Sequence, residues 1–358
     1  MSNYIEYNDK IVFHPGYYIK EIIEDSGLTQ EDFAKRLDTS AKNLSYIVRG
    51  EQSISVDMAM KLSRMLGTST NYWLNLQQTY DMQVAEMKLE NKMEEERAIF
   101  KELGYKYFKD FFGLPDLPRK VDEQIERVRT FLQVSSLTVF KERDMAVSFR
   151  NCEKEMNDSN IIKANIMVQI AINKAMTIEA PKFNKAKFEE AAEYALTLTQ
   201  NHTEFYPILR ERFREAGVVF VILPNLPGSK TNGATKKIGN NILLMVNDRR
   251  MYSDIFWFTL FHEIGHIMNG DYGITFEGEN DLEDAADRYA EDSLIPPDEY
   301  DKFLQADRFD VSSIRQFASS ISRDPGIVLG RLRNDNIVSY KDWKLSDAFT
   351  HQYKVRMN

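Results

Sequence analysis

The sequence MYSDIFWFTLFHEIGH, residues 251–266, joins an apolar run to two histidines four residues apart. The run from 251 to 261 contains neither Gly nor Pro, and this predicts a buried helix. On a helix, His262 and His266 lie one turn apart on the same face, where both imidazoles can bind one metal ion. Glu263 lies between them, in the position of a general base for a zinc-activated water. We therefore predict one Zn²⁺ per chain.

A third metal ligand is expected on a following helix. Seventeen residues after His266, the stretch LEDAADRYA (282–290) places Glu283 and Asp287 one helical turn apart. One helix could thus offer a ligand and a second carboxylate that accepts the N–H of a metal-bound imidazole. A chance match is the alternative, but the chain has only five His. A pair at metal spacing is therefore no by-product of histidine abundance.

The bulk composition is that of a soluble globular protein with two or three domains. The chain has 358 residues, 43% hydrophobic and 28% charged, and a net charge of −9. This charge argues against broad, non-specific nucleic-acid binding, so any DNA contact must come from a local surface. No apolar stretch approaches a membrane span, the start lacks signal-peptide features, and the one cysteine, Cys152, makes no internal disulfide. We expect a cytoplasmic location.

Residues 14–79 have the pattern of a compact helical unit. Thr29 is a good N-cap for a helix over 30–37, a break at 38–39 follows, and Ser40 caps a second helix over 41–48. A further helix is expected from Ser55 to Leu66. Helix, three-residue turn, helix is the DNA-binding helix-turn-helix arrangement, whose second helix enters the major groove.

The second of these helices is expected to face outward with short, polar and weakly basic side chains. Such side chains suit contacts with base edges and phosphates. Residues 35–64 contain six Lys or Arg against three acidic residues, so the patch is basic inside an acidic chain. A helical protein-interaction module with a solvated polar face is the alternative. The outward residues are Lys42, Asn43, Ser45, Tyr46 and Arg49.

The rest of the chain is predicted to be helical apart from a small sheet. Residues 80–110 read as a charged helical linker, and 111–216 as a helical scaffold with amphipathic runs at 119–133, 159–176, 184–199 and 204–216. Strands are expected at 218–223 and 241–247, with a polar loop or weak strand at 228–239. Helices at 312–320 and 327–332 end the chain.

The N-terminal motifs resemble the XRE-type helix-turn-helix of HigA-like antitoxins. The similarity lies in residues 14–30, 40–50 and 66–77. Asp38 departs from the family, which often has Gly in the turn, but Asp tolerates left-handed geometry. We add the cap residue Ser40 to the candidate DNA contacts. The resemblance implies that the other contacts are Gln30, Lys42, Asn43, Ser45 and Arg49.

Residues 217–297 resemble the ImmA/IrrE family of zinc metallopeptidases. The similarity is carried by Pro227-Gly228, residues 232–235, the stretch 256–266, residues 283–290 and 294–296. It implies that His262, His266 and Glu283 bind zinc, that Glu263 is the general base and that Asp287 supports a ligand. Ala285 stands where the family commonly has a second acid, which leaves Glu283 as the carboxylate ligand and Asp284 as its competitor.

Together these features predict an α+β fold that is mostly α. We expect a helix-turn-helix domain (1–79), the linker (80–110), the helical scaffold (111–216) and a zincin-like domain (217–358) with a small antiparallel or mixed sheet. The expected function is DNA-binding regulation with zinc-dependent cleavage of a specific repressor- or antitoxin-type protein. The alternative is a repressor or antitoxin whose zincin-like domain senses a ligand or binds a partner without cutting. We expect a homodimer on a palindromic operator and no membrane association.

Overall fold

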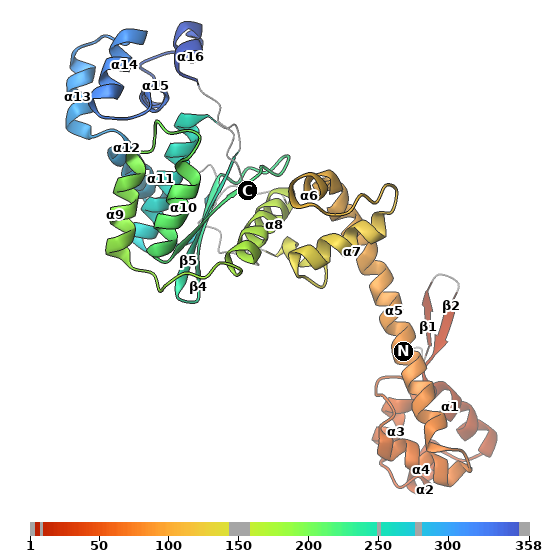
Figure 1. Ribbon diagram of the computed structural model, residues 1–358. Helices are drawn as coiled ribbons and strands as arrows, with labels where there is room; N and C mark the ends of the chain where they lie inside the picture. The colour runs from red at the N-terminus through yellow and green to blue at the C-terminus, as the bar shows by residue number, and fades with distance from the viewer. Residues whose placement is uncertain (1–3, 8–9, 143–157, 249–251, 276–280, 351–358) are drawn as a thin grey trace. The chain divides into compact units, whose positions relative to one another are not determined.

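The computed structural model describes residues 4–7, 10–142, 158–248, 252–275 and 281–350. Cys152 and Met251, the first residue of the apolar run 251–261, lie outside these ranges. The chain divides into two compact units, Met1–Glu95 and Glu96–Asn358, and most of their elements are labelled in Figure 1. The predicted majority of helix and the small mixed sheet are confirmed.

The first unit is a helical bundle preceded by a strand pair that we did not predict. Strand β1 (Tyr4–Tyr7) pairs antiparallel with β2 (Lys10–Phe13). The predicted N-caps are confirmed, because the side chains of Thr29, Ser40 and Ser55 each accept a hydrogen bond from the third following backbone N–H. The helices are α1 (Pro15–Ser26), α2 (Gln30–Arg36), α3 (Ala41–Val48), α4 (Val56–Leu66) and the start of α5 (Thr70–Leu103).

Helices α1 and α3 approach closely at a glycine. A Cβ at Gly16 would lie 2.8 Å from the carbonyl carbon of Ile47, so only Gly allows this packing. The core behind it consists of fully buried side chains that include Phe33, Leu44 and Trp73. Asp38 has φ 53°, so the turn between α2 and α3 has the predicted left-handed residue.

Helix α5 continues through residue 79, where we expected a domain to end. It is unbroken from Thr70 to Leu103, and Gly104 follows with φ 73°. The boundary between the compact units falls after Glu95, within the stretch 80–110 that we predicted as a linker.

The second unit places helices around a four-stranded mixed sheet. The strand order is β3-β5-β4-β6, with β3 parallel to β5 and the other neighbours antiparallel. The strands are β3 (Val218–Leu223), β4 (Gly233–Ile238), β5 (Asn241–Asn247) and β6 (Gly273–Thr275). The predicted strands at 218–223 and 241–247 are thus confirmed, and β4 is the weak strand of the polar loop.

Eleven α-helices and one 3₁₀ helix complete the described part of the second unit. Those before the sheet are α6 (Tyr105–Phe112), α7 (Val121–Leu132), the 3₁₀ helix η1 (Leu137–Lys141), α8 (Asp158–Ala175), α9 (Lys185–Leu196) and α10 (Phe205–Glu215). Those after β5 are α11 (Ser253–Asn269), which precedes β6, and then α12 (Asp281–Leu294), α13 (Pro297–Gln305), α14 (Val311–Ser320), α15 (Pro325–Asn334) and α16 (Trp343–Phe349).

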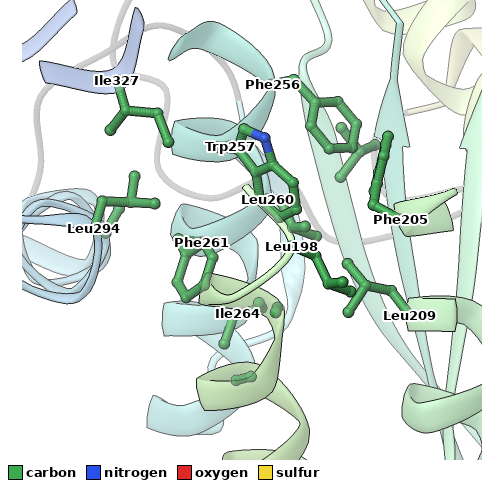
Figure 2. Close-up of a cluster of buried hydrophobic side chains, with 14 of the residues drawn as sticks. Leu198, Phe205, Leu209, Phe256, Trp257, Leu260, Phe261, Ile264, Leu294 and Ile327 are labelled. Carbon is green, nitrogen blue, oxygen red and sulfur yellow. The ribbon is translucent and has the colours of Figure 1, made fainter. Parts of the chain in front are cut away.

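Helix α11 lies in the main hydrophobic core of this unit (Figure 2). Trp257, Leu260 and Phe261 are at most 1% exposed. Phe205 and Leu209 of α10 belong to the same cluster. Residues 111–216, which we predicted as a helical scaffold packing against the following domain, thus contribute α10 to the core that holds the sheet and α11. This core fixes the helix that carries the two histidines.

Candidate metal centre and helix-turn-helix surface

Three predicted ligands meet in the interior of the second unit. Nε2 of His262 lies 3.0 Å from Nε2 of His266 and 3.1 Å from Oε2 of Glu283. One ligand atom from each of these residues lies within 4.8 Å of the others, and all three side chains are buried. Asp284, the competing ligand, is exposed on α12. The structure thus brings together the three residues that we predicted as ligands.

A close contact between two helices brings the carboxylate to the histidines. A Cβ at Gly265 would lie 3.2 Å from Cα of Ala286 and 3.1 Å from Cβ of Tyr289, so glycine lets α12 pack tightly on α11. Gly265 is the fourth residue of the HEIGH motif. The same close packing places Glu283, one turn before Ala286 on α12, beside the two imidazoles.

A carboxylate orients each imidazole. Nδ1 of His262 lies 2.7 Å from Oδ1 of Asp287, and Nδ1 of His266 lies 3.0 Å from Oδ2 of Asp271. If each Nδ1–H donates to its carboxylate, both Nε2 atoms keep their lone pairs for a metal ion. We did not predict Asp271 from the sequence, because its contact with His266 depends on the chain reversal after Gly270, whose φ is 79°.

Glu263 is fully buried beside the candidate ligands. Both carboxylate oxygens lack a hydrogen-bond partner among the described residues. A Cβ at Gly233 on β4 would lie 2.6 Å from Cγ of Glu263, so this glycine makes room for the side chain. A buried carboxylate without partners is costly, and such a group points to a ligand that would satisfy it.

Two of the predicted ligands have shifted pKa values. Burial lowers the pKa of His262, but hydrogen bonds to Asp287 and Glu283 outweigh burial and raise this pKa to about 9. Burial raises the pKa of Glu283, but hydrogen bonds to His262 and His266 prevail and lower it to about 2. Because zinc binds the neutral imidazole, metal binding must displace the proton that His262 retains at neutral pH.

The donor set fits zinc. Two imidazoles and one carboxylate are the protein ligands of catalytic zinc sites that keep a fourth position open. The orphaned carboxylate of Glu263 next to these ligands also fits a site that holds a cation and a polar ligand.

In the first unit, the predicted DNA-contact residues on α2 and α3 differ in their exposure. Lys42 and Arg49 are exposed, whereas Gln30, Asn43 and Ser45 are partly buried. The hydroxyl of Ser40 caps α3 by accepting from the backbone N–H of Asn43 at 3.1 Å. Its role in the described structure is therefore to hold the helix.

Several polar groups on this surface already have partners. The amide of Asn43 donates to the hydroxyl of Thr39 at 3.0 Å, and the guanidinium of Arg49 donates to Glu51 at 2.9 Å. Arg49 also lies over the ring of Tyr46, with 5.2 Å to the centroid. The basic patch that we counted from sequence is thus partly neutralised by its own acidic neighbours.

Among the described residues, no helix is long and apolar enough to cross a membrane.

Comparisons with known proteins match the N-terminal residues. Virulence-associated protein I from Dichelobacter nodosus is 35% identical over 80 residues, which are 22% of this chain and 74% of that protein. The uncharacterized HTH-type transcriptional regulator YddM from Escherichia coli K12 is 31% identical over 72 residues, 20% of this chain and 77% of that one.

Solved structures match a similar share of the chain. Pseudomonas aeruginosa antitoxin HigA with the higBA promoter is 32% identical and covers 24% of this chain and 94% of that one, with a TM-score of 0.23. A putative antidote protein of a plasmid maintenance system from Nostoc punctiforme is 34% identical and covers 23% of this chain and 91% of that one, with a TM-score of 0.23. The family described as helix-turn-helix (HTH_3) matches residues 19–73. Through these N-terminal residues, the chain belongs to the helix-turn-helix family.

Proposed function

We propose that this helix-turn-helix regulator carries a zinc-dependent endopeptidase in its second unit and cuts a specific regulatory protein. The observation that supports the enzyme is the cluster of His262, His266 and Glu283 with the buried, unpartnered carboxylate of Glu263 beside it. Such a cluster has the parts of a zinc hydrolase, namely three ligands and a general base. The resemblance of residues 217–297 to the ImmA/IrrE family points the same way.

The first unit would bring the protein to operator DNA. Its family membership and the exposed Lys42 and Arg49 on α3 support this role. Binding would depend strongly on salt, because a chain of net charge −9 must rely on a local cationic surface. Helix-turn-helix proteins bind as two-fold dimers, so we expect a homodimer on a palindromic site.

The chain's own residues would carry the proton transfers. When bound, zinc would polarise a scissile carbonyl and acidify a water. Glu263 would accept a proton from the attacking water and deliver it to the leaving amine. Asp287 and Asp271 would hold the two imidazoles in the tautomer that binds metal through Nε2.

The decisive experiment compares new protein N-termini in a lysate of host cells. One sample receives the zinc-loaded wild type and the other receives zinc-loaded Glu263→Gln, which removes the base and keeps the side-chain volume. We expect N-termini that only the wild type produces. Equal zinc content by native mass spectrometry is the control for an intact site, and identical sets of N-termini in both samples would refute the peptidase.

One observation favours the alternative, a zinc site that senses a ligand or holds a partner without cutting. His262, Glu263, His266 and Glu283 are each at most 6% exposed, so a substrate can reach them only if the site opens. This alternative predicts that zinc-loaded protein changes operator affinity or binds a partner while Glu263→Gln behaves like the wild type.

A further inference from the structure

A cavity of about 250 Å³ lies between α11, α12 and α15 of the second unit. Its buried walls are apolar, because Leu294, Ile295 and Ile327 line it and are at most 4% exposed. Two carboxylates, those of Asp254 and Glu291, line it as well. The cavity can therefore hold a segment that has both apolar and positively charged side chains.

The cavity has more carboxylates than its own cation can balance. Arg331 also lines it, but its guanidinium is shared between Glu291 at 2.8 Å and Asp335 at 2.9 Å. Within the described ranges, Asp254 forms no ion pair. Burial raises the pKa of its carboxyl group, because a buried carboxylate is poorly solvated. A cation placed in the cavity would supply the partner that Asp254 lacks.

Helix α16 ends beside this cavity. The backbone oxygen of Phe349 lies 2.9 Å from the position of a Cβ on Gly326, which directly precedes Ile327 of the cavity wall. The same Cβ position lies 2.5 Å from Oγ of Ser253, which directly precedes Asp254. The residues that follow α16 therefore start next to the cavity lining on two helices, α11 and α15.

Residues 351–358 have the charge and the length to enter the cavity. Their sequence, HQYKVRMN, contains two cations, Lys354 and Arg356, and no acidic residue. Apolar or aromatic side chains alternate with these cations, so an extended segment would offer the cavity both kinds of group. Eight extended residues reach ~27 Å, whereas the cavity lining on α15, from Ile327 to Asn334, covers ~11 Å.

We infer that residues 351–358 dock in the cavity between α11, α12 and α15 of their own chain. A cationic side chain of this segment faces Asp254, and its apolar side chains cover Leu294 and Ile327. Because α11 and α12 carry the candidate zinc ligands, docking adds a link between the two helices that build the metal centre. Docking depends neither on zinc nor on peptidase activity. The same segment of a second copy is the competing occupant.

Limited proteolysis of the full-length protein tests this docking. Trypsin cleaves after Lys354 and Arg356, and intact-mass spectrometry gives the initial rates at both bonds. A synthetic peptide with the sequence of residues 348–358 gives the rate for an unprotected segment. The protein receives no added zinc, so the result does not depend on the proposed peptidase.

Two variants disturb the cavity in different ways. Ile255→Trp fills it, and Asp254→Asn removes a carboxylate while it keeps the size of the side chain. Ile208→Trp on α10 is the matched control, because Ile208 is a partly buried apolar residue that does not line the cavity.

We expect trypsin to cut the wild type at least ~10-fold more slowly than the peptide, because cleavage follows the fraction of time that the segment is undocked. Ile255→Trp and Asp254→Asn should be cut faster than the wild type, at rates that approach that of the peptide, and Ile208→Trp should be cut like the wild type. Equal rates for wild type and peptide would overturn the inference, and so would protection that both cavity variants retain. Protection that disappears on dilution would assign the segment to a second copy and overturn docking within one chain.

Discussion

Replacing Asp271 by Ala should weaken zinc binding, although Asp271 is no ligand. Its Oδ2 lies 3.0 Å from Nδ1 of His266, and its side chain is 17% exposed. Without this acceptor, the imidazole of His266 loses the contact that fixes its orientation and raises its basicity toward the metal.

The structure sets the size of the effect. A hydrogen bond to a charged group contributes about 1.5–3 kcal/mol, and about 1.4 kcal/mol corresponds to a factor of ten in affinity. We therefore expect the zinc dissociation constant of Asp271→Ala to rise roughly 10- to 100-fold. Asp287 contacts His262 at 2.7 Å, but its side chain is 47% exposed. Since water can replace a solvated acceptor, Asp287→Ala should cost only a few-fold in affinity.

The assay is competition for zinc with a chromophoric chelator at constant pH. Asp284→Ala is the matched control, because Asp284 is an exposed carboxylate next to Glu283 and contacts neither imidazole in the described structure. Wild-type affinity in Asp271→Ala would refute the role of this carboxylate. A larger loss in Asp284→Ala than in Asp271→Ala would refute the assignment of Glu283 as the ligand.

Three further changes test other parts of the structure. Lys42→Ala combined with Arg49→Ala should abolish binding to the DNA upstream of the gene in fluorescence anisotropy, and unchanged binding would exclude α3 as the groove-binding helix. Because the pKa of metal-free His262 is raised to about 9, zinc must displace its proton. Zinc affinity should therefore climb by roughly tenfold per pH unit between pH 7 and 9 and then level off, whereas a flat profile would contradict this proton release. Gly16→Ala should destabilise the first unit by roughly 1–3 kcal/mol, because its Cβ would strike the Ile47 backbone, and an unshifted melting transition would disprove that contact.

Local patterns were enough to predict the helices of the first unit and the ligand-bearing helix. Ser40 and Thr29 cap helices because a side-chain acceptor at that position is a local requirement. The HEIGH motif places two imidazoles on one face of any helix, so His262 and His266 needed no tertiary information. Glu283 needed the resemblance as well, because its distance from the histidines depends on the packing of α12 against Gly265.

What could not be predicted depends on how side chains meet once the chain has folded. Asp271 reaches His266 only because the chain reverses after Gly270, and a lone aspartate in a loop carries no such signal. The ion pair of Arg49 with Glu51 depends on the conformations of both side chains, and a count of charges does not show it. We predicted a domain boundary between residues 216 and 217 because the helical pattern changes there to a strand pattern. In the structure, Phe205 and Leu209 pack in the same hydrophobic core as the sheet.

We propose above all that His262, His266 and Glu283 form a zinc site in the second unit. The most direct test is the number of zinc ions per chain, measured by native mass spectrometry on the wild type and on His262→Ala. We predict one zinc in the wild type and none in the variant. A carefully prepared wild type without zinc, or a variant that keeps its zinc, would contradict the claim.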